Sequence, residues 1–132
     1  MTQHRVAIGN EQDVVAARQL VRSVAADEQF SLLARTRLAT AVSELARNIV
    51  RYAGGSGQME VECVREGGRS GIRCVFTDRG PGIADVDLAM QEGFSTGRSL
   101  GQGLPGARRL VDQLSIESEV GVGTQITIVA WR

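Results

Sequence analysis

Glu44 and Asn48 are the first residues whose types and spacing could do chemistry. They stand four residues apart in the segment AVSELARNIVRYA, whose apolar residues recur at three- and four-residue steps. Residues four apart share one face of a helix. An asparagine oxygen suits Mg²⁺, which takes few protein ligands, and a carboxylate one turn away could orient or deprotonate an attacking hydroxyl. The same pair also fits an ordinary polar helix face, so the spacing alone leaves both interpretations open.

A second segment, TDRGPGI, places an acidic residue between an apolar strand pattern and two glycines. Asp78 ends the strand pattern, and Gly80 and Gly82 follow it at alternate positions. Because glycine has no side chain, another group can approach the backbone closely there. A carboxylate held at this point could accept a hydrogen bond from an exocyclic amino group such as that of adenine. An aspartate that ends a hairpin strand before ordinary turn glycines would show the same pattern.

Three glycines in LGQGLPGARRL have the spacing G-x-G-x-x-G of loops that hold phosphates. A dinucleotide-binding fold is excluded, because a polar segment precedes Gly101 and no βαβ unit follows. What remains is a loop that opens a helix, in which the backbone N–H groups from Gly101 through Gly103 to Leu104 point at one anion. A flexible loop before a helix start fits this stretch equally well. Gly106 is expected inside the following helix.

The composition indicates one soluble globular domain over residues 1–132. The chain is 42% hydrophobic and 23% charged, and its length suits a single core. Its formal net charge is zero, so no long-range field draws it to nucleic acid or to a membrane surface. It has no apolar run of about 20 residues and no secretory leader at its start. We therefore expect a cytoplasmic protein that binds neither nucleic acid nor membrane.

Two residue types exclude further kinds of chemistry. All 15 basic residues are arginine, and without lysine a Walker A loop, a eukaryotic-type protein kinase and Schiff-base catalysis are excluded. Cys63 and Cys74 are too few for a disulfide framework or a four-ligand zinc site. If Arg65 pairs with Ile72 in a hairpin, Cys63 falls opposite Cys74. We nevertheless expect reduced thiols in a cytoplasmic protein.

The elements that must position these residues follow from changes of hydrophobic period along the chain. Helical spacing predicts helices over 13–26, 31–52 and 104–114, with a short one near 85–91. Alternation predicts strands over 4–10, 114–120 and 124–132, and a hairpin over 58–78 that turns at 66–71. This order argues for an α+β fold: a two-layer α/β sandwich whose mostly antiparallel mixed sheet is covered on one face by helices.

Taken together and in this order, the segments resemble the GHKL superfamily of ATP-binding domains, which has the Bergerat fold. The resemblance covers effectively the whole chain and implies a role for each candidate residue. Glu44 and Asn48 match the N box, with Asn48 on Mg²⁺. The remaining matches are the adenine box D-x-G-x-G at Asp78, Gly80 and Gly82, the phosphate box at Gly101 and Gly103, and the final G-T motif near the adenine at Thr124 in GVGTQITI.

A narrower similarity is to the RsbT-type serine/threonine kinases, relatives of the anti-sigma factor kinases that act in partner-switching stress signalling. It is carried by VVAARQLVR, SELARNIVRYAGG, DRGPGI, EGFSTG and GLPGARRLVD. The similarity implies ATP and Mg²⁺ as cofactors and a serine or threonine on a small STAS-domain protein as acceptor. It also implies activation of a downstream regulator, such as a PP2C-type phosphatase, after release. The alternative is an anti-sigma factor or binding module whose ATP site gates partner affinity with little catalysis.

The resemblance also implies how a transfer step is arranged. ATP with Mg²⁺ lies between the helix of Glu44 and a lid over roughly residues 84–100, which orders when ATP binds. Glu44 orients or deprotonates the incoming hydroxyl. An arginine near the γ-phosphate would stabilise the transferred charge, and the candidates, each also fitting solvated surface, are Arg47, Arg79 and Arg98. The only histidine, His4, falls in a predicted strand, which argues against the phosphoacceptor of a histidine kinase.

Overall fold

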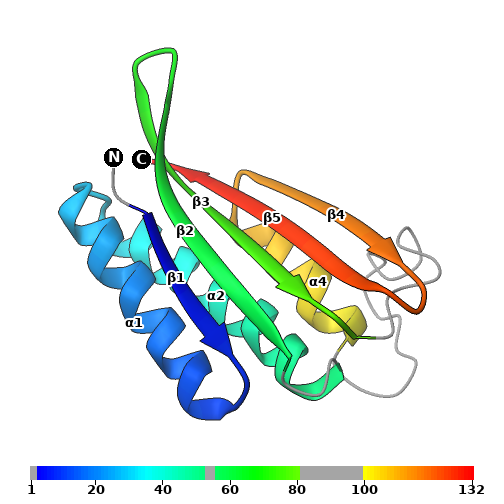
Figure 1. Cartoon of the computed structure of the whole chain (residues 1–132). Coiled ribbons are helices and arrows are strands. Elements are labelled where there is room, and N and C mark those ends of the chain that lie inside the picture. Colours follow the sequence, from blue (N-terminus) through cyan, green and yellow to red (C-terminus); the bar gives the residue numbers. More distant parts are fainter. Residues whose placement is uncertain (1–2, 53–55, 81–99) are drawn as a thin grey trace.

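The computed structural model describes residues 3–52, 56–80 and 100–132, and the described elements form two layers (Figure 1). They follow one another as the sequence predicts, with strand, two helices, hairpin, helix and hairpin. The elements are β1 (Gln3–Ile8), α1 (Glu11–Asp27), α2 (Leu32–Tyr52), β2 (Gly57–Glu66), β3 (Arg69–Asp78), α4 (Leu100–Leu110), β4 (Gln113–Glu119) and β5 (Gly123–Trp131). The predicted short helix near 85–91 and nearly all of the expected lid lie outside the described residues.

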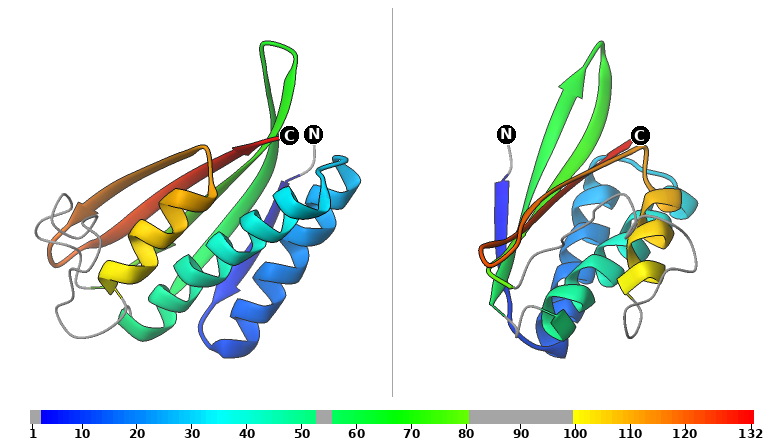
Figure 2. Two further views of the ribbon diagram at one scale, coloured as in Figure 1. Left: turned by 180° about the vertical axis from the view of Figure 1, so that it is seen from behind. Right: turned by 90° about the vertical axis from the view of Figure 1, so that its right-hand side faces the viewer.

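One five-stranded sheet forms the first layer, in the order β1-β2-β3-β5-β4. Every neighbouring pair is antiparallel, so the mixed sheet that we expected has no parallel pair among the described strands. The described helices cover one face of the sheet, with α2 between α1 and α4 (Figure 2). The predicted α+β two-layer sandwich is confirmed. Within the described part of the chain, no helix combines the length and apolar character needed to span a bilayer.

The helices and the sheet share one apolar core. α1 begins after Asn10, whose side-chain oxygen accepts a hydrogen bond from the N–H of Asp13 at 3.0 Å, an N-cap contact that satisfies a free helical donor. Along both long helices the apolar residues recur at helical spacing and face inward. The largest fully buried side chains are Phe76, Ile8, Leu38, Leu45, Met59, Ile72, Leu104, Ile128, Val14, Val21, Val42 and Val61.

The β2–β3 hairpin has a tighter turn than the sequence suggested. Gly67 and Gly68, with φ of 58° and 81°, form a two-residue connection, which their positive φ angles allow. The sequence pattern predicts a turn over residues 66–71, and the shorter connection changes the register of the two strands. Cys63 therefore pairs with Ile72 rather than with Cys74, which pairs with Val61.

Both cysteines are free thiols in this arrangement. Burial raises the pKa of the Cys74 thiol from its ordinary value to about 12. Burial also raises the pKa of Cys63, with a smaller contribution from the nearby carboxylate of Glu28. Because the raised pKa keeps both thiols protonated, little thiolate is present to act as a nucleophile or a metal ligand. The two cysteines therefore act as small apolar side chains that pack in the structure.

The third described helix begins earlier than predicted. α4 spans Leu100–Leu110 instead of 104–114, so the glycine-rich stretch forms its first turn. Pro105 is then the sixth helical residue and not part of the first turn. Because proline has no N–H, the carbonyl of Gly101 lacks its helical donor four residues ahead. Glycine and proline both argue against helix from sequence alone, which explains why the start was placed too late.

Candidate functional site

The predicted site residues gather at one end of the two-layer structure. The C-terminal half of α2, the N-terminal end of α4, the last residue of β3 and the first residues of β5 all lie there (Figure 1). Asp78 and Thr124 are direct partners in the β3–β5 ladder, and α2 packs along α4. Segments from residue 44 to residue 124 are thereby brought together. Gly82 lies outside the described residues.

Asn48 is the buried member of the pair on α2. Its side chain is 8% exposed, and its Nδ2 has no hydrogen-bond partner among the described residues. Buried polar atoms almost always have a partner, so this amide requires one from elsewhere. An amide has nearly the same shape when turned by half a rotation, which puts Oδ1 in place of Nδ2. In that turned orientation, and not with the Nδ2 donor facing the site, Asn48 could serve as a Mg²⁺ ligand.

Glu44 lies one helical turn before Asn48, with a side chain 37% exposed. Its Oε1 accepts a hydrogen bond from Nη1 of Arg47 at 3.5 Å. The residues Glu44 and Asn48 thus combine a solvent-accessible carboxylate with a buried amide on one helix. Among residues 3–52, 56–80 and 100–132, no three His, Cys, Asp or Glu side chains gather as a metal site. A cation here would need oxygens from a bound phosphate as well.

Asp78 is held at the end of β3 by its own chain. Its Oδ1 accepts a hydrogen bond from the N–H of Gly80 at 2.8 Å, which closes a small turn and fixes the carboxylate orientation. Across the ladder, Thr124 is buried, and its hydroxyl lies 2.9 Å from the hydroxyl of Ser118 on β4. The sequence did not identify Ser118, because no motif marks a serine on the neighbouring strand.

Two glycines surround the backbone of Asp78. Asp78 pairs with Gly57 of β2 on one side and lies against Gly123 of β5 on the other. A Cβ on Gly123 would lie 3.0 Å from the carbonyl carbon of Asp78 and 3.1 Å from the Cα of Arg79, and still closer to the Asp78 carbonyl oxygen. Gly123 also has a φ of 149°. Only glycine permits this approach, and the main chain of Asp78 is fixed as a result.

Gly101 and Gly103 lie in the first turn of α4, where helical N–H groups lack intrahelical acceptors. This end of a helix also carries the positive end of the helix dipole, so it attracts anions. The side chain of Leu104 is fully buried in the core. Its predicted part in phosphate binding therefore falls to its backbone N–H and stays a prediction, as do those of Gly101 and Gly103.

The three arginines considered near a phosphate differ in their surroundings. Arg98 lies outside the described residues, and Arg79 is exposed at the end of β3, where its N–H donates to the carbonyl of Ser56 at 3.2 Å. Arg47 is ion-paired with Glu44 and with Glu11 of α1. No motif in the sequence marks Glu11, which stands 36 residues away from Arg47 in the chain.

The sequence of this chain is similar to those of known kinases and regulators. Residues 34–131 match the model of the histidine kinase-, DNA gyrase B-, and HSP90-like ATPase family. The serine/threonine-protein kinase RsbT of Bacillus subtilis (strain 168) is 48% identical over 126 residues, covering 96% of this chain and 94% of that protein. The anti-sigma F factor of Thermoanaerobacter sp. (strain X514) is 27% identical over 129 residues, covering 94% of this chain and 89% of that protein.

Solved structures share the fold at low sequence identity. The catalytic domain of histidine kinase ThkA in a nucleotide-free form has a TM-score of 0.58 at 15% identity, covering 99% of this chain and 98% of that chain. Full-length ShkA in complex with AMPPNP has a TM-score of 0.61 at 18% identity, covering 98% of this chain and 31% of that chain. At these identities the likeness concerns the fold alone.

Proposed function

The chain belongs to the histidine kinase-, DNA gyrase B-, and HSP90-like ATPase family, and from that premise we propose that it is an ATP-dependent protein serine/threonine kinase of a partner switch. Its 48% identity to a serine/threonine-protein kinase over 96% of the chain supports the activity. Its 27% identity to an anti-sigma F factor supports a regulatory setting. The one histidine, His4, lies in β1 and not on a helix, which fits a kinase whose acceptor lies on another protein. The sequence also has no lysine to act as the catalytic lysine of related ATPases.

The observation that carries the proposal is the buried Asn48 amide without a partner, one turn from the accessible carboxylate of Glu44. We assign Asn48 to Mg²⁺, which would bring positive charge to the phosphate oxygens. The backbone N–H groups of Gly101, Gly103 and Leu104 bind phosphate oxygens at the start of α4. Asp78 and Thr124 bind the adenine end, with Gly80 fixing the Asp78 carboxylate and Gly82 completing the same motif.

In the proposed transfer, the acceptor hydroxyl oxygen forms a bond to the γ-phosphorus of ATP. The bond between the γ-phosphorus and the β–γ bridging oxygen breaks, and ADP leaves with that oxygen. The hydroxyl proton passes to the carboxylate of Glu44, which lies on the accessible side of α2. Phosphoserine or phosphothreonine and ADP are the products.

We propose a small STAS-domain protein as the acceptor. Release from it would free the kinase to activate a downstream regulator such as a PP2C-type phosphatase. The support is the similarity to RsbT-type kinases in the segments quoted above, together with the identity to RsbT itself. A cytoplasmic location belongs to the same proposal, because ATP and two free thiols fit a reducing compartment.

The test is transfer from Mg·ATP to a purified STAS-domain protein encoded beside this gene, with phosphoserine or phosphothreonine detected by mass spectrometry. We expect Glu44→Gln to lower the transfer rate by about 10²–10⁴-fold, as for loss of a general base. Asn48→Ala should abolish Mg²⁺-dependent ATP binding measured by calorimetry. Thr40→Ala, on the exposed side of the same helix, is the matched control and should change neither quantity.

The binding-module alternative makes a different prediction for the same mixture. If ATP binds with Asn48 intact but no phosphoryl group is transferred, while ATP changes the affinity for a partner, the chain is an ATP-gated binding module. Its 27% identity to an anti-sigma F factor is the observation that favours this second candidate. Transfer that survives Asn48→Ala would show that the Mg²⁺ assignment is wrong.

A further inference from the structure

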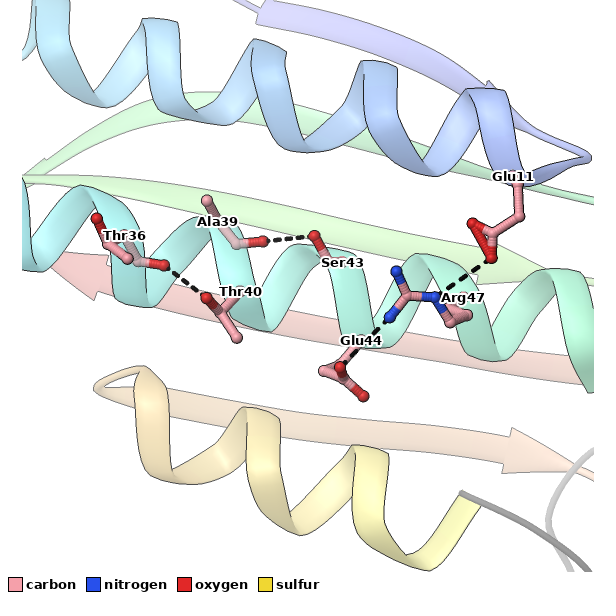
Figure 3. Close-up of polar contacts among 7 residues, drawn as sticks. All are labelled: Glu11, Thr36, Ala39, Thr40, Ser43, Glu44 and Arg47. Atoms are coloured by element: carbon pink, nitrogen blue, oxygen red, sulfur yellow. Dashed lines mark hydrogen bonds and ion pairs between the residues drawn. The ribbon is translucent and has the colours of Figure 1, made fainter.

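The side chain of Arg47 connects α2 to the beginning of α1. Its Nε lies 3.3 Å from Oε1 of Glu11, and its Nη1 lies 3.5 Å from Oε1 of Glu44 (Figure 3). Glu11 is the first residue of α1, whereas Glu44 is in the second half of α2. One guanidinium therefore links the carboxylate that we place in the reaction to a helix that supplies no other residue of the site.

This link differs from a single surface ion pair in geometry and in the partial burial of its arginine, although the Glu11 side chain is 63% exposed. The Arg47 side chain is 27% exposed, whereas Arg5, which pairs with Glu60 on the open sheet face, is 68% exposed. Arg47 uses one nitrogen for each carboxylate. A guanidinium is planar and rigid, so fixing its Nε fixes the direction of its Nη1.

The link occupies one oxygen of Glu44 and leaves the other available. Oε1 accepts from Arg47, and Oε2 has no partner among the described residues. Figure 3 shows Glu44 on the side of α2 nearer to α4, whereas Arg47 reaches toward α1. A free glutamate side chain samples several rotamers, and an acceptor hydroxyl requires the carboxylate in one of them. Holding Oε1 from behind presents Oε2 on the α4 side, where the phosphate glycines begin.

We propose that Arg47 is a positioning residue that orients Glu44 for proton acceptance, and that Glu11 holds Arg47 in place. This inference rests on the proposed kinase function, because it concerns the orientation of the carboxylate that accepts the proton. It also assigns a role to α1 in the transfer step. A direct contact of Arg47 with the γ-phosphate is the competing role, and it would act through affinity for ATP.

The experiment measures transfer rate and ATP affinity separately in Glu11→Gln, Arg47→Gln and the double variant. We expect Arg47→Gln to lower kcat about tenfold or more and Glu11→Gln to lower it severalfold, with the ATP dissociation constant changed less than twofold. In the Arg47→Gln background, Glu11→Gln should have no further effect, because Glu11 acts through Arg47. Arg5→Gln, another ion-paired arginine, is the control and should leave kcat unchanged.

Arg47→Lys distinguishes geometry from charge. A lysine ammonium keeps the positive charge but cannot direct two fixed N–H groups at two carboxylates. We expect Arg47→Lys to retain most of the kcat loss of Arg47→Gln. Recovery by lysine, additive effects of the two variants, or a loss of ATP affinity parallel to the loss of kcat would each overturn the proposal.

A measurement that needs no catalysis separates this inference from the proposed function. The Nε–H signal of Arg47 in ¹H–¹⁵N spectra should shift on Glu11→Gln and also on Glu44→Gln. If these shifts occur but the wild-type protein transfers no phosphate, the kinase proposal fails and the link stands as a structural feature without a positioning role. If the wild-type protein transfers phosphate and the signal responds to neither variant, the positioning inference is wrong.

Discussion

Replacing Gly123 by alanine tests whether the close approach of β5 to Asp78 holds the end of the site that we propose binds adenine. The new Cβ would lie 3.0 Å from the Asp78 carbonyl carbon and closer still to its oxygen, at the first residue of β5, next to the last β3–β5 pair Asp78–Thr124. Overpacking of this kind costs about 1–3 kcal/mol. The φ of 149° adds about 1–3 kcal/mol for a residue with a Cβ.

The expected total of about 2–6 kcal/mol is large beside the typical free energy of unfolding of about 5–15 kcal/mol. For a chain of this size, at about 3–5 °C per kcal/mol, it lowers Tm by roughly 6–30 °C in thermal unfolding followed by circular dichroism. Affinity for Mg·ATP, measured by calorimetry below the transition, should fall as well, because the strain displaces the Asp78 main chain.

Two other glycines separate the contributions. Gly121 has a φ of 83°, but a Cβ there meets nothing within 4 Å, so Gly121→Ala should cost only about 1–2 kcal/mol and leave ATP affinity unchanged. Gly106 lies inside α4 with open space around it, so Gly106→Ala should stabilise the protein by about 0.5–1 kcal/mol. Equal Tm values and equal ATP affinities for the alanine variants at 121 and 123 would refute the reasoning.

Two further predictions concern the sheet. With a pKa of about 12, Cys74 should resist iodoacetamide at pH 8 in the folded state and react after denaturation. Because folding raises the pKa of the Cys74 thiol, its contribution to stability is present below the ordinary thiol pKa and is lost as the pH rises toward 12. The urea concentration at the unfolding midpoint should therefore fall with rising pH, and a midpoint that is independent of pH between 8 and 11 would contradict this. Gly71→Ala would place a Cβ 2.5 Å from the ring of Trp131, the only tryptophan. It should shift the tryptophan emission and cost about 1–3 kcal/mol, and unchanged emission would argue against this packing.

What the sequence predicted well depends on local periodicity. The i,i+4 relation of Glu44 and Asn48 is a property of one helix, and the predicted long helix is present. The placement of Asp78 at a strand end is likewise local, and the structure puts it there, opposite Thr124. Whether these residues bind Mg²⁺ and adenine stays a prediction, because geometry without a nucleotide does not test it.

What the sequence predicted poorly depends on turns and on distant contacts. The predicted hairpin register was wrong because the register depends on the length of the turn. Gly67 and Gly68 alone form the turn, whereas the prediction used six residues. The contact of Glu11 with Arg47 joins α1 to α2, and no spacing rule connects such positions. The start of α4 was misplaced because packing of Leu104 in the core outweighs the poor helix propensity of the glycines.

The site residues differ in what fixes their side chains, and this difference explains why an arginine from the same helix, itself paired with α1, holds Glu44. Burial fixes Asn48, and the Gly80 amide together with the approach of Gly123 fixes Asp78. In the proposed transfer Glu44 must remain accessible to an incoming protein, and its side chain is 37% exposed. Accessibility leaves a carboxylate free to rotate, which is poor geometry for proton transfer. An arginine anchored from a second helix restricts that rotation without burying the reactive oxygen, whereas burial would have excluded the substrate.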